Sequence, residues 1–122
     1  MLSACPAGGA RREWRRKPLP RSNIMSRMSA LIIVDIEVTD PVVYEDYKRL
    51  ASASIAAHGG RYLVRGGRNE VLDGDWTPHR LVILEFDSFE KAKAWRESPE
   101  YAEAKKVREH CARSNMVVVE GV

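Results

Sequence analysis

Residues 31–67 read LIIVDIEVTDPVVYEDYKRLASASIAAHGGRYLVRGG, and this stretch decides the fold. Residues 31–38 are mostly apolar and β-branched, which is typical of a buried strand. In residues 41–57 apolar side chains recur three and four positions apart, which predicts an amphipathic helix that the glycine pair at 59–60 ends. Residues 61–65 then form a second strand, so the stretch predicts a strand, a helix and a strand in succession.

The second half of the chain supplies the remaining elements. Residues 73–79 hold Asp-Gly and Thr-Pro pairs that indicate a loop, and residues 80–86 form another apolar strand. Ser88 and Ser98 can each cap a helix, the second with a proline directly after it. Residues 116–122 are rich in valine and predict a last strand. The order β-α-β-β-α-β predicts an α+β, ferredoxin-like fold with a four-stranded antiparallel sheet.

The strands at 31–38 and 80–86 are apolar on both faces. Leu31 and Ile33 alternate with Ile32, and the strand at 80–86 repeats the pattern. A sheet with one face in water should alternate apolar and polar residues, and helices on one side can cover only one face. We therefore predict a homodimer in which two copies pack through the uncovered sheet face as a dimeric α/β barrel.

Charge and composition divide the chain into a basic extension, residues 1–27, and a domain, residues 28–122. The extension holds seven Lys or Arg and one Glu, whereas the domain holds thirteen Lys or Arg and sixteen Asp or Glu. The extension has no helical or strand period, which predicts disorder. The acidic balance of the domain argues against nucleic acid as a partner. No apolar run approaches the about 20 residues of a membrane span, and two cysteines suggest a reducing, cytoplasmic location.

Charged residues inside the predicted strands are candidates for chemistry. Asp35, Glu37, Arg61, Arg65 and Glu85 all have odd numbers, although shared parity across strands does not prove a shared face. In a functional interpretation, Arg65 or Arg61 binds an anionic or enolate oxygen while a carboxylate moves protons. In a structural interpretation, the same charges form a buried or interfacial ion-pair network. The catalytic candidates are Arg65, Asp35, Glu85 and His58.

Aromatic and basic residues suggest an apolar ligand pocket between helices and sheet. The pocket candidates are Tyr44, Arg61, Tyr62, Arg65, Trp76, Arg80, Trp95 and Tyr101. The alternative is that the aromatic residues are anchors in the core or at the dimer interface. His58 is either a base beside the pocket or a group that interacts with a helix C-terminus.

Motifs for metals and cofactors are not evident. The spacing of the three histidines matches no metal-ligand motif, and Gly66-Gly67-Arg68 lacks the lysine and helix of a phosphate loop. We therefore predict no metal and no cofactor. Gly66 and Gly67 let the strand bend before a hairpin, or let another backbone or a ligand approach Arg65 closely.

The domain resembles the domain of unknown function (DUF) 1330 family. The resemblance rests on GGRYLVRGG, VLDGDWTPHRLVILEFDSFEKAKAW, SPEYAEAKKVR and VVVEG, and it spans about residues 30–121. It implies a dimeric α/β barrel of ferredoxin-like subunits and no particular reaction. Relatives by fold include cofactor-free monooxygenases and muconolactone isomerase-like proteins. We expect a cofactor-independent monooxygenase-like or isomerase-like enzyme for a small acidic organic molecule, or a non-catalytic ligand-binding or regulatory homodimer.

Overall fold

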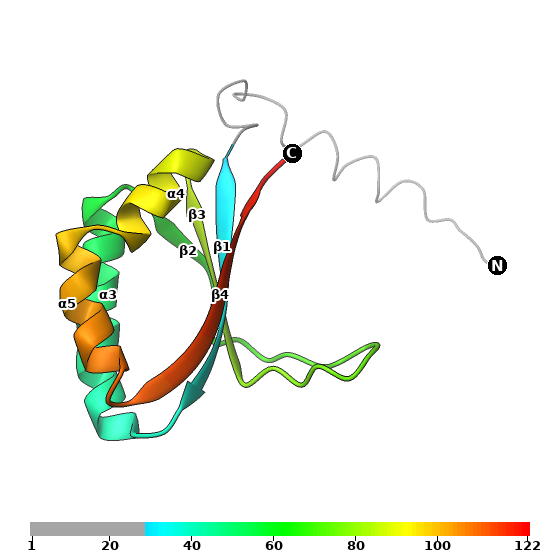
Figure 1. Cartoon of the computed structure of the whole chain (residues 1–122). Coiled ribbons are helices and arrows are strands. Elements are labelled where there is room, and N and C mark those ends of the chain that lie inside the picture. The colour runs from blue at the N-terminus through cyan, green and yellow to red at the C-terminus, as the bar shows by residue number, and fades with distance from the viewer. Residues whose placement is uncertain (1–28) are drawn as a thin grey trace.

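The computed structural model describes residues 29–122 (Figure 1), and the extension predicted for residues 1–27 lies outside them. The elements follow the predicted order, with the second helical segment broken in two at Glu97 and Ser98. They are β1 (Ala30–Val38), α3 (Pro41–Ala57), β2 (Arg61–Arg65), β3 (Arg80–Phe86), α4 (Phe89–Arg96), α5 (Pro99–Arg108) and β4 (Ala112–Glu120).

The four strands form one antiparallel sheet in the order β2-β3-β1-β4. The three helices all cover the same face of this sheet (Figure 1). Even-numbered residues of β1, such as Ile32 and Val34, point toward the helices and are buried. The predicted ferredoxin-like α+β fold is therefore confirmed.

Trp95 is the centre of the core between the helices and the sheet. Its ring lies 5.5 Å from that of Phe86 and 4.5 Å from that of Tyr101, measured between ring centres. Its indole N–H donates a hydrogen bond of 3.0 Å to Ser54, which in turn donates to the carbonyl of Ala51 at 2.8 Å. Because the indole nitrogen is satisfied inside the core, Trp95 joins α3, α4, α5 and β3 without leaving a buried polar group unpaired.

The predicted helix signals are confirmed. Asp40 accepts hydrogen bonds from the backbone of Val42 and Val43, and Ser98 accepts one from Tyr101. Ser88 caps α4 in the same way, and Gly59 ends α3 with a φ of 77°. These contacts satisfy backbone groups at the helix ends that no helical partner can reach.

The end of the chain differs from the sequence prediction. Helix α5 ends at Arg108, and Cys111 lies in the turn that follows. The Cys111 carbonyl accepts hydrogen bonds from the backbone of Thr39 at 2.7 Å and Asp40 at 3.1 Å. These bonds hold the turn against the end of β1, so β4 already begins at Ala112, four residues before the predicted strand.

A β-bulge in β2 changes which face its last residues occupy. Arg61 pairs with Glu85 and Tyr62 with Leu84, but the next pair joins Val64 to Ile83, which leaves one extra residue in β2. After the bulge the alternation is reversed, so Arg65 lies opposite Val82 on the helix side. Arg61 stays on the far face, and the two arginines that share odd parity are separated.

The face of the sheet opposite the helices is apolar and uncovered in residues 29–122. Leu63, Val117 and Val119 are 52 %, 56 % and 44 % exposed, and Ile33 and Ile83 between them are only half-buried. The loop of residues 66–79 extends from this side of the molecule (Figure 1). Exposed aliphatic side chains that adjoin one another in this way are typical of a protein interface.

Candidate functional site

Five of the eight predicted pocket residues lie together between α3 and the sheet. Tyr44, Tyr62, Arg65, Arg80 and Trp95 all line one cavity. The cavity measures only about 30 Å³. The predicted residues therefore converge, but they enclose too little space for a ring-sized molecule.

Two arginines of this group are held against tyrosines. Arg80 donates a hydrogen bond of 3.1 Å to the hydroxyl of Tyr44, and Arg65 donates one of 3.1 Å to Ser52. The Arg65 guanidinium lies 4.4 Å from the ring centre of Tyr62, whose hydroxyl shares a hydrogen bond of 3.0 Å with Ser52. Burial raises the pKa of Tyr44 above its usual value, although Arg80 opposes the shift, so Tyr44 is a neutral phenol at pH 7.

The absence of a side chain at Gly66 leaves room for the guanidinium of Arg80. Gly66 has a φ of 72°, a conformation that residues with a side chain rarely adopt, and a Cβ atom there would collide with the Arg80 guanidinium. A Cβ atom on the neighbouring Gly67 would have no neighbour within 4 Å. The glycine pair therefore allows both the bend after β2 and the close approach of an arginine.

Replacement of Gly66 tests this role. We expect Gly66→Ala to lower the free energy of unfolding by about 1–2 kcal/mol, because alanine is strained at positive φ. Gly67→Ala is the matched control and should change it by less than about 0.5 kcal/mol. Denaturant unfolding of both variants at one protomer concentration makes the comparison, and equal stabilities would contradict the role of Gly66.

Asp35 holds the loop of residues 66–79 at its base. Its carboxylate accepts hydrogen bonds from the backbone of His79 at 2.8 Å and from the indole of Trp76 at 3.0 Å. Burial alone would raise the pKa of Asp35, but these bonds and the imidazole of His79 outweigh it and hold the pKa below its usual value. Trp76 is otherwise 60 % exposed, so the contact fixes an aromatic side chain at the edge of the uncovered sheet face.

The depressed pKa of Asp35 predicts a pH-dependent contribution to stability. Asp35→Asn should lower the free energy of unfolding by about 1–3 kcal/mol at pH 7, because two donors lose a charged acceptor. A carboxyl group whose pKa is lower in the folded state stabilises the fold at pH values above its unfolded-state pKa of about 3.9. This contribution is lost as the pH falls through the folded-state pKa. The difference between the two proteins should therefore narrow below about pH 4 in unfolding curves at fixed protomer concentration. A difference that stays constant to pH 3 would contradict this role.

The remaining predicted residues lie apart from one another. Arg61 and Glu85 pair across β2 and β3, with 3.0 Å between nitrogen and oxygen. His58 contacts Glu100 at 3.0 Å and so links the end of α3 to the start of α5. Tyr101 shares a buried hydrogen bond of 3.1 Å with Tyr47. Asp35, Glu85 and His58 thus occupy three separate places and do not form one catalytic group.

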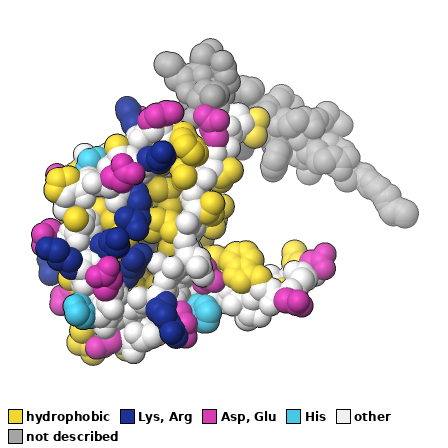
Figure 2. Space-filling model, in the orientation of Figure 1, with side chains coloured by type: hydrophobic (Ala, Val, Ile, Leu, Met, Phe, Trp, Pro, Cys, Tyr) yellow, Lys and Arg dark blue, Asp and Glu magenta, His cyan; other side chains and the backbone are white. Residues whose placement is uncertain are grey.

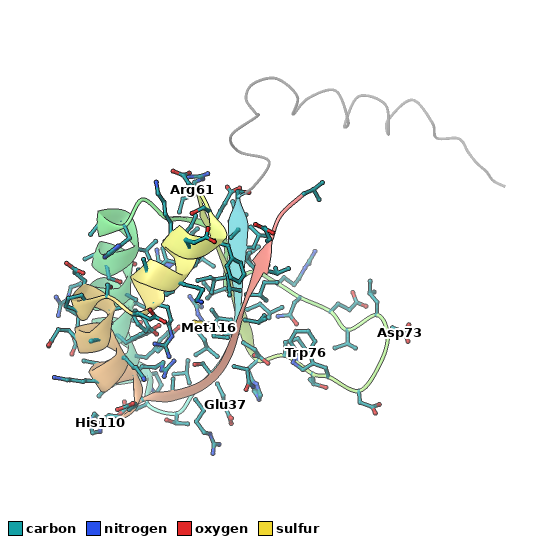
Figure 3. All side chains as sticks on the ribbon, turned by 45° about the horizontal axis from the view of Figure 1, so that its top comes forward. Glu37, Arg61, Asp73, Trp76, His110 and Met116 are labelled. Atoms are coloured by element: carbon teal, nitrogen blue, oxygen red, sulfur yellow. The ribbon has the colours of Figure 1, made fainter. Side chains whose placement is uncertain are left out.

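A larger cleft lies between α4, α5 and β4, and the sequence did not predict it. It has a volume of about 330 Å³, within the range of small-molecule sites. Its lining residues are Ile32, Ala92, Lys93, Arg96, Glu97, Arg108, Ser114, Met116 and Val118. Figure 2 shows a column of Lys and Arg side chains beside an apolar hollow between the helices and the sheet, and Figure 3 shows Met116 on the inner side of β4. We call this site the cationic cleft.

The basic residues of the cationic cleft form no ion pair within residues 29–122, although Glu97 also lines the cleft. Arg108 donates a hydrogen bond of 2.7 Å to Ser114, and the Arg96 guanidinium lies 5.2 Å from the ring centre of Tyr101. Within residues 29–122, neither these arginines nor Lys93 has a carboxylate within 4.0 Å. Three basic side chains therefore surround an apolar floor, an arrangement suited to an organic anion.

Two structural absences apply to the part of the chain that the structure describes. None of the helices in residues 29–122 has the length and apolar composition of a membrane span. No three His, Cys, Asp or Glu side chains in residues 29–122 lie close enough together to hold a metal ion.

Comparison with known families identifies the domain. The family described as "Domain of unknown function (DUF1330)" matches residues 29–122. The chain belongs to the DUF1330 family. This match covers every residue that the structure describes, so the cationic cleft and the Arg65–Arg80 cluster both lie inside the DUF1330 domain. A search of curated proteins gave no significant match.

Solved structures share the DUF1330 fold at low sequence identity. A protein of unknown function from Rhodopseudomonas palustris is 16 % identical, with a TM-score of 0.64 over 96 % of this chain and 95 % of that one. SnoaB, a cofactor-independent oxygenase from Streptomyces nogalater, is 10 % identical, with a TM-score of 0.53 over 75 % and 91 %. A dimeric protein of unknown function with a ferredoxin-like fold from Bacteroides fragilis is 20 % identical, with a TM-score of 0.51 over 75 % and 95 %.

Proposed function

We propose that this DUF1330 protein is a homodimer that binds a small organic acid with an apolar body in the cationic cleft. The observation that carries this proposal is the combination of a 330 Å³ volume with basic side chains that have no carboxylate partner in the described residues. An anionic group would lie against Arg96, Arg108 and Lys93. The apolar part would lie on Met116 and Val118.

The physical chemistry of the cleft favours an acid over a neutral molecule. Arg108 is half-buried and has one hydroxyl partner, so a carboxylate would form charge-assisted hydrogen bonds with it in a partly water-excluded site. The one acid in the lining, Glu97, is exposed and can turn to solvent. The apolar floor adds affinity in proportion to the surface that the ligand buries.

Binding without turnover is the function that the cleft supports best. The carboxylates and the histidine that we considered as proton-transfer groups, Asp35, Glu85 and His58, have other partners and do not line the cleft. Catalysis is the second candidate, because three cations beside an apolar floor would also stabilise an enolate or phenolate, with Glu97, the one carboxylate in the lining, or water accepting the proton that the bound acid loses.

The homodimer is proposed on the basis of the uncovered sheet face. Leu63, Val117 and Val119 are exposed aliphatic residues on or beside that face, and Trp76 stands at its edge. A second copy of the same face is complementary in chemistry, as a symmetric interface requires. The Bacteroides fragilis relative is described as dimeric, which supports the same assembly here. We also propose a cytoplasmic location, in keeping with the buried, unpaired thiol of Cys111.

A matched pair of ligands tests the proposal. We expect 2-naphthoate to raise the melting temperature and to give a saturable isotherm in titration calorimetry, whereas the neutral 2-naphthamide should bind at least about tenfold more weakly. Incubation of the acid with the protein in air, followed by mass spectrometry, separates binding from turnover. Equal binding of acid and amide, or no binding of either, would contradict an organic-acid site.

A further inference from the structure

Arg65 and Arg80, which line the small cavity between α3 and the sheet, differ from the other arginines on the strands. On β2, Arg61 is paired with Glu85 across the strands, and on β4, Arg113 is paired with Glu37. Arg65 and Arg80 have no carboxylate within 4.0 Å in residues 29–122. Arg80 is half-buried, and a charge that is partly removed from water without an opposite charge is unfavourable, so Arg80 with the exposed Arg65 beside the same cavity marks a place where an anion can bind.

Arg65 and Arg80 line the same small cavity. The bulge in β2 places Arg65 on the helix side of the sheet, and Arg80 lies against the backbone of Gly66, the next residue in the chain. Each arginine is fixed by a hydroxyl, Arg65 by Ser52 and Arg80 by Tyr44. Because these hydroxyls take one donor from each group, further guanidinium N–H groups are left to bind a ligand.

The cavity behind the arginines limits the size of that ligand. Its volume of about 30 Å³ accommodates one or two non-hydrogen atoms. Its walls include the apolar side chains of Val34, Ile36, Val82, Leu84, Ala51 and Ile55. Arg65 is exposed and Lys48 half-buried, so the charged residues form the solvent end of the cavity and the aliphatic residues form its closed end.

We propose that Arg65 and Arg80 form a second binding site, for a short-chain carboxylate of the size of acetate or propionate. The carboxylate oxygens accept hydrogen bonds from the two guanidinium groups, and the methyl or ethyl group enters the aliphatic cavity. The buried phenol of Tyr44, which is neutral at pH 7, adds no negative charge that would oppose the anion. Met116 lines both this cavity and the cationic cleft, but the two sites have no basic residue in common, so they adjoin each other and bind their anions through different groups.

An NMR titration with sodium acetate and sodium propionate tests this site in the full chain. Sodium chloride holds the ionic strength constant, because a change in ionic strength by itself would alter the interactions of exposed charges. We expect saturable shifts of the backbone amides of Gly66 and Leu81, which are hydrogen-bonded neighbours at the arginine pair. Arg80→Gln should weaken acetate binding by about tenfold or more, since it removes a charge-assisted contact.

Arg68→Gln is the matched control. It removes the same charge from an exposed position three residues after Arg65, and it should leave the acetate affinity unchanged. If Arg80→Gln disturbs folding by circular dichroism, Arg65→Gln replaces it as the test variant. Shifts that do not saturate, or equal affinities of the two variants, would overturn the site. Acetate shifts confined to Ala92 and Val118 would also overturn it, and 2-naphthoate binding read at those residues tests the cationic cleft independently.

Discussion

Val117→Glu is expected to convert the proposed dimer into monomers. Val117 lies opposite Ile33 in the sheet, and Ile33 lies opposite Ile83, so the substitution falls on the uncovered face, midway along its edge strand β4. In a symmetric dimer one substitution places two carboxylates in the interface, and each must lose water without a partner. We expect the dissociation constant to rise by about a thousandfold or more, equivalent to about 4 kcal/mol.

Sedimentation equilibrium over a range of concentrations measures this effect. Val117 is 56 % exposed in the single chain, so glutamate should leave the subunit folded, which circular dichroism verifies. Val42→Glu is the control, because Val42 is 80 % exposed in the first turn of α3, on the other side of the molecule. If Val117→Glu assembles as the unchanged protein does, the sheet face is not the interface.

Arg108→Glu is expected to remove binding of 2-naphthoate. Arg108 is the half-buried cation of the cleft, fixed by its 2.7 Å hydrogen bond to Ser114. Reversal of its charge removes a charge-assisted hydrogen bond and sets a carboxylate beside the bound acid. The dissociation constant in titration calorimetry should rise by about a hundredfold, equivalent to about 2.7 kcal/mol.

Lys106→Glu gives the matched control on the same helix. Lys106 is exposed, pairs with Glu103 and does not line the cleft, yet the substitution changes the net charge by the same amount. We expect its affinity to stay within about threefold of the unchanged protein, because exposed charges are screened. Equal losses of affinity for 2-naphthoate in both variants would mean that the net charge of the protein, and not Arg108 in the cleft, attracts the ligand.

The sequence was sufficient for the fold because its signals are local. The caps at Asp40, Ser88 and Ser98 and the glycine after α3 fix the helix ends through contacts within four residues. The apolar residues on both faces of residues 31–38 and 80–86 predicted an uncovered face, and the structure has one. Patterns of this kind do not depend on distant parts of the chain.

The candidate sites depend on features that a linear pattern does not contain. The bulge in β2 reverses the alternation and separates Arg65 from Arg61, and only the register with β3 reveals it. The cationic cleft combines Lys93 and Arg96 of α4 with Arg108 of α5. The sequence signal for the cleft was the basic residues in the last turns of both helices. Basic residues are common in that position because they stabilise a helix C-terminus, so they do not by themselves indicate a binding site.

Met116 offers the most direct test of the cationic cleft. It is the only methionine in residues 29–122, and it lines the cleft on the inner face of β4 (Figure 3). Its methyl resonance can be assigned with Met116→Leu in protein that carries ¹³C-methyl methionine. We predict that this resonance shifts and saturates with 2-naphthoate, and shifts much less with 2-naphthamide at the same concentration. A Met116 resonance that stays unmoved while 2-naphthoate binds by calorimetry would contradict the account.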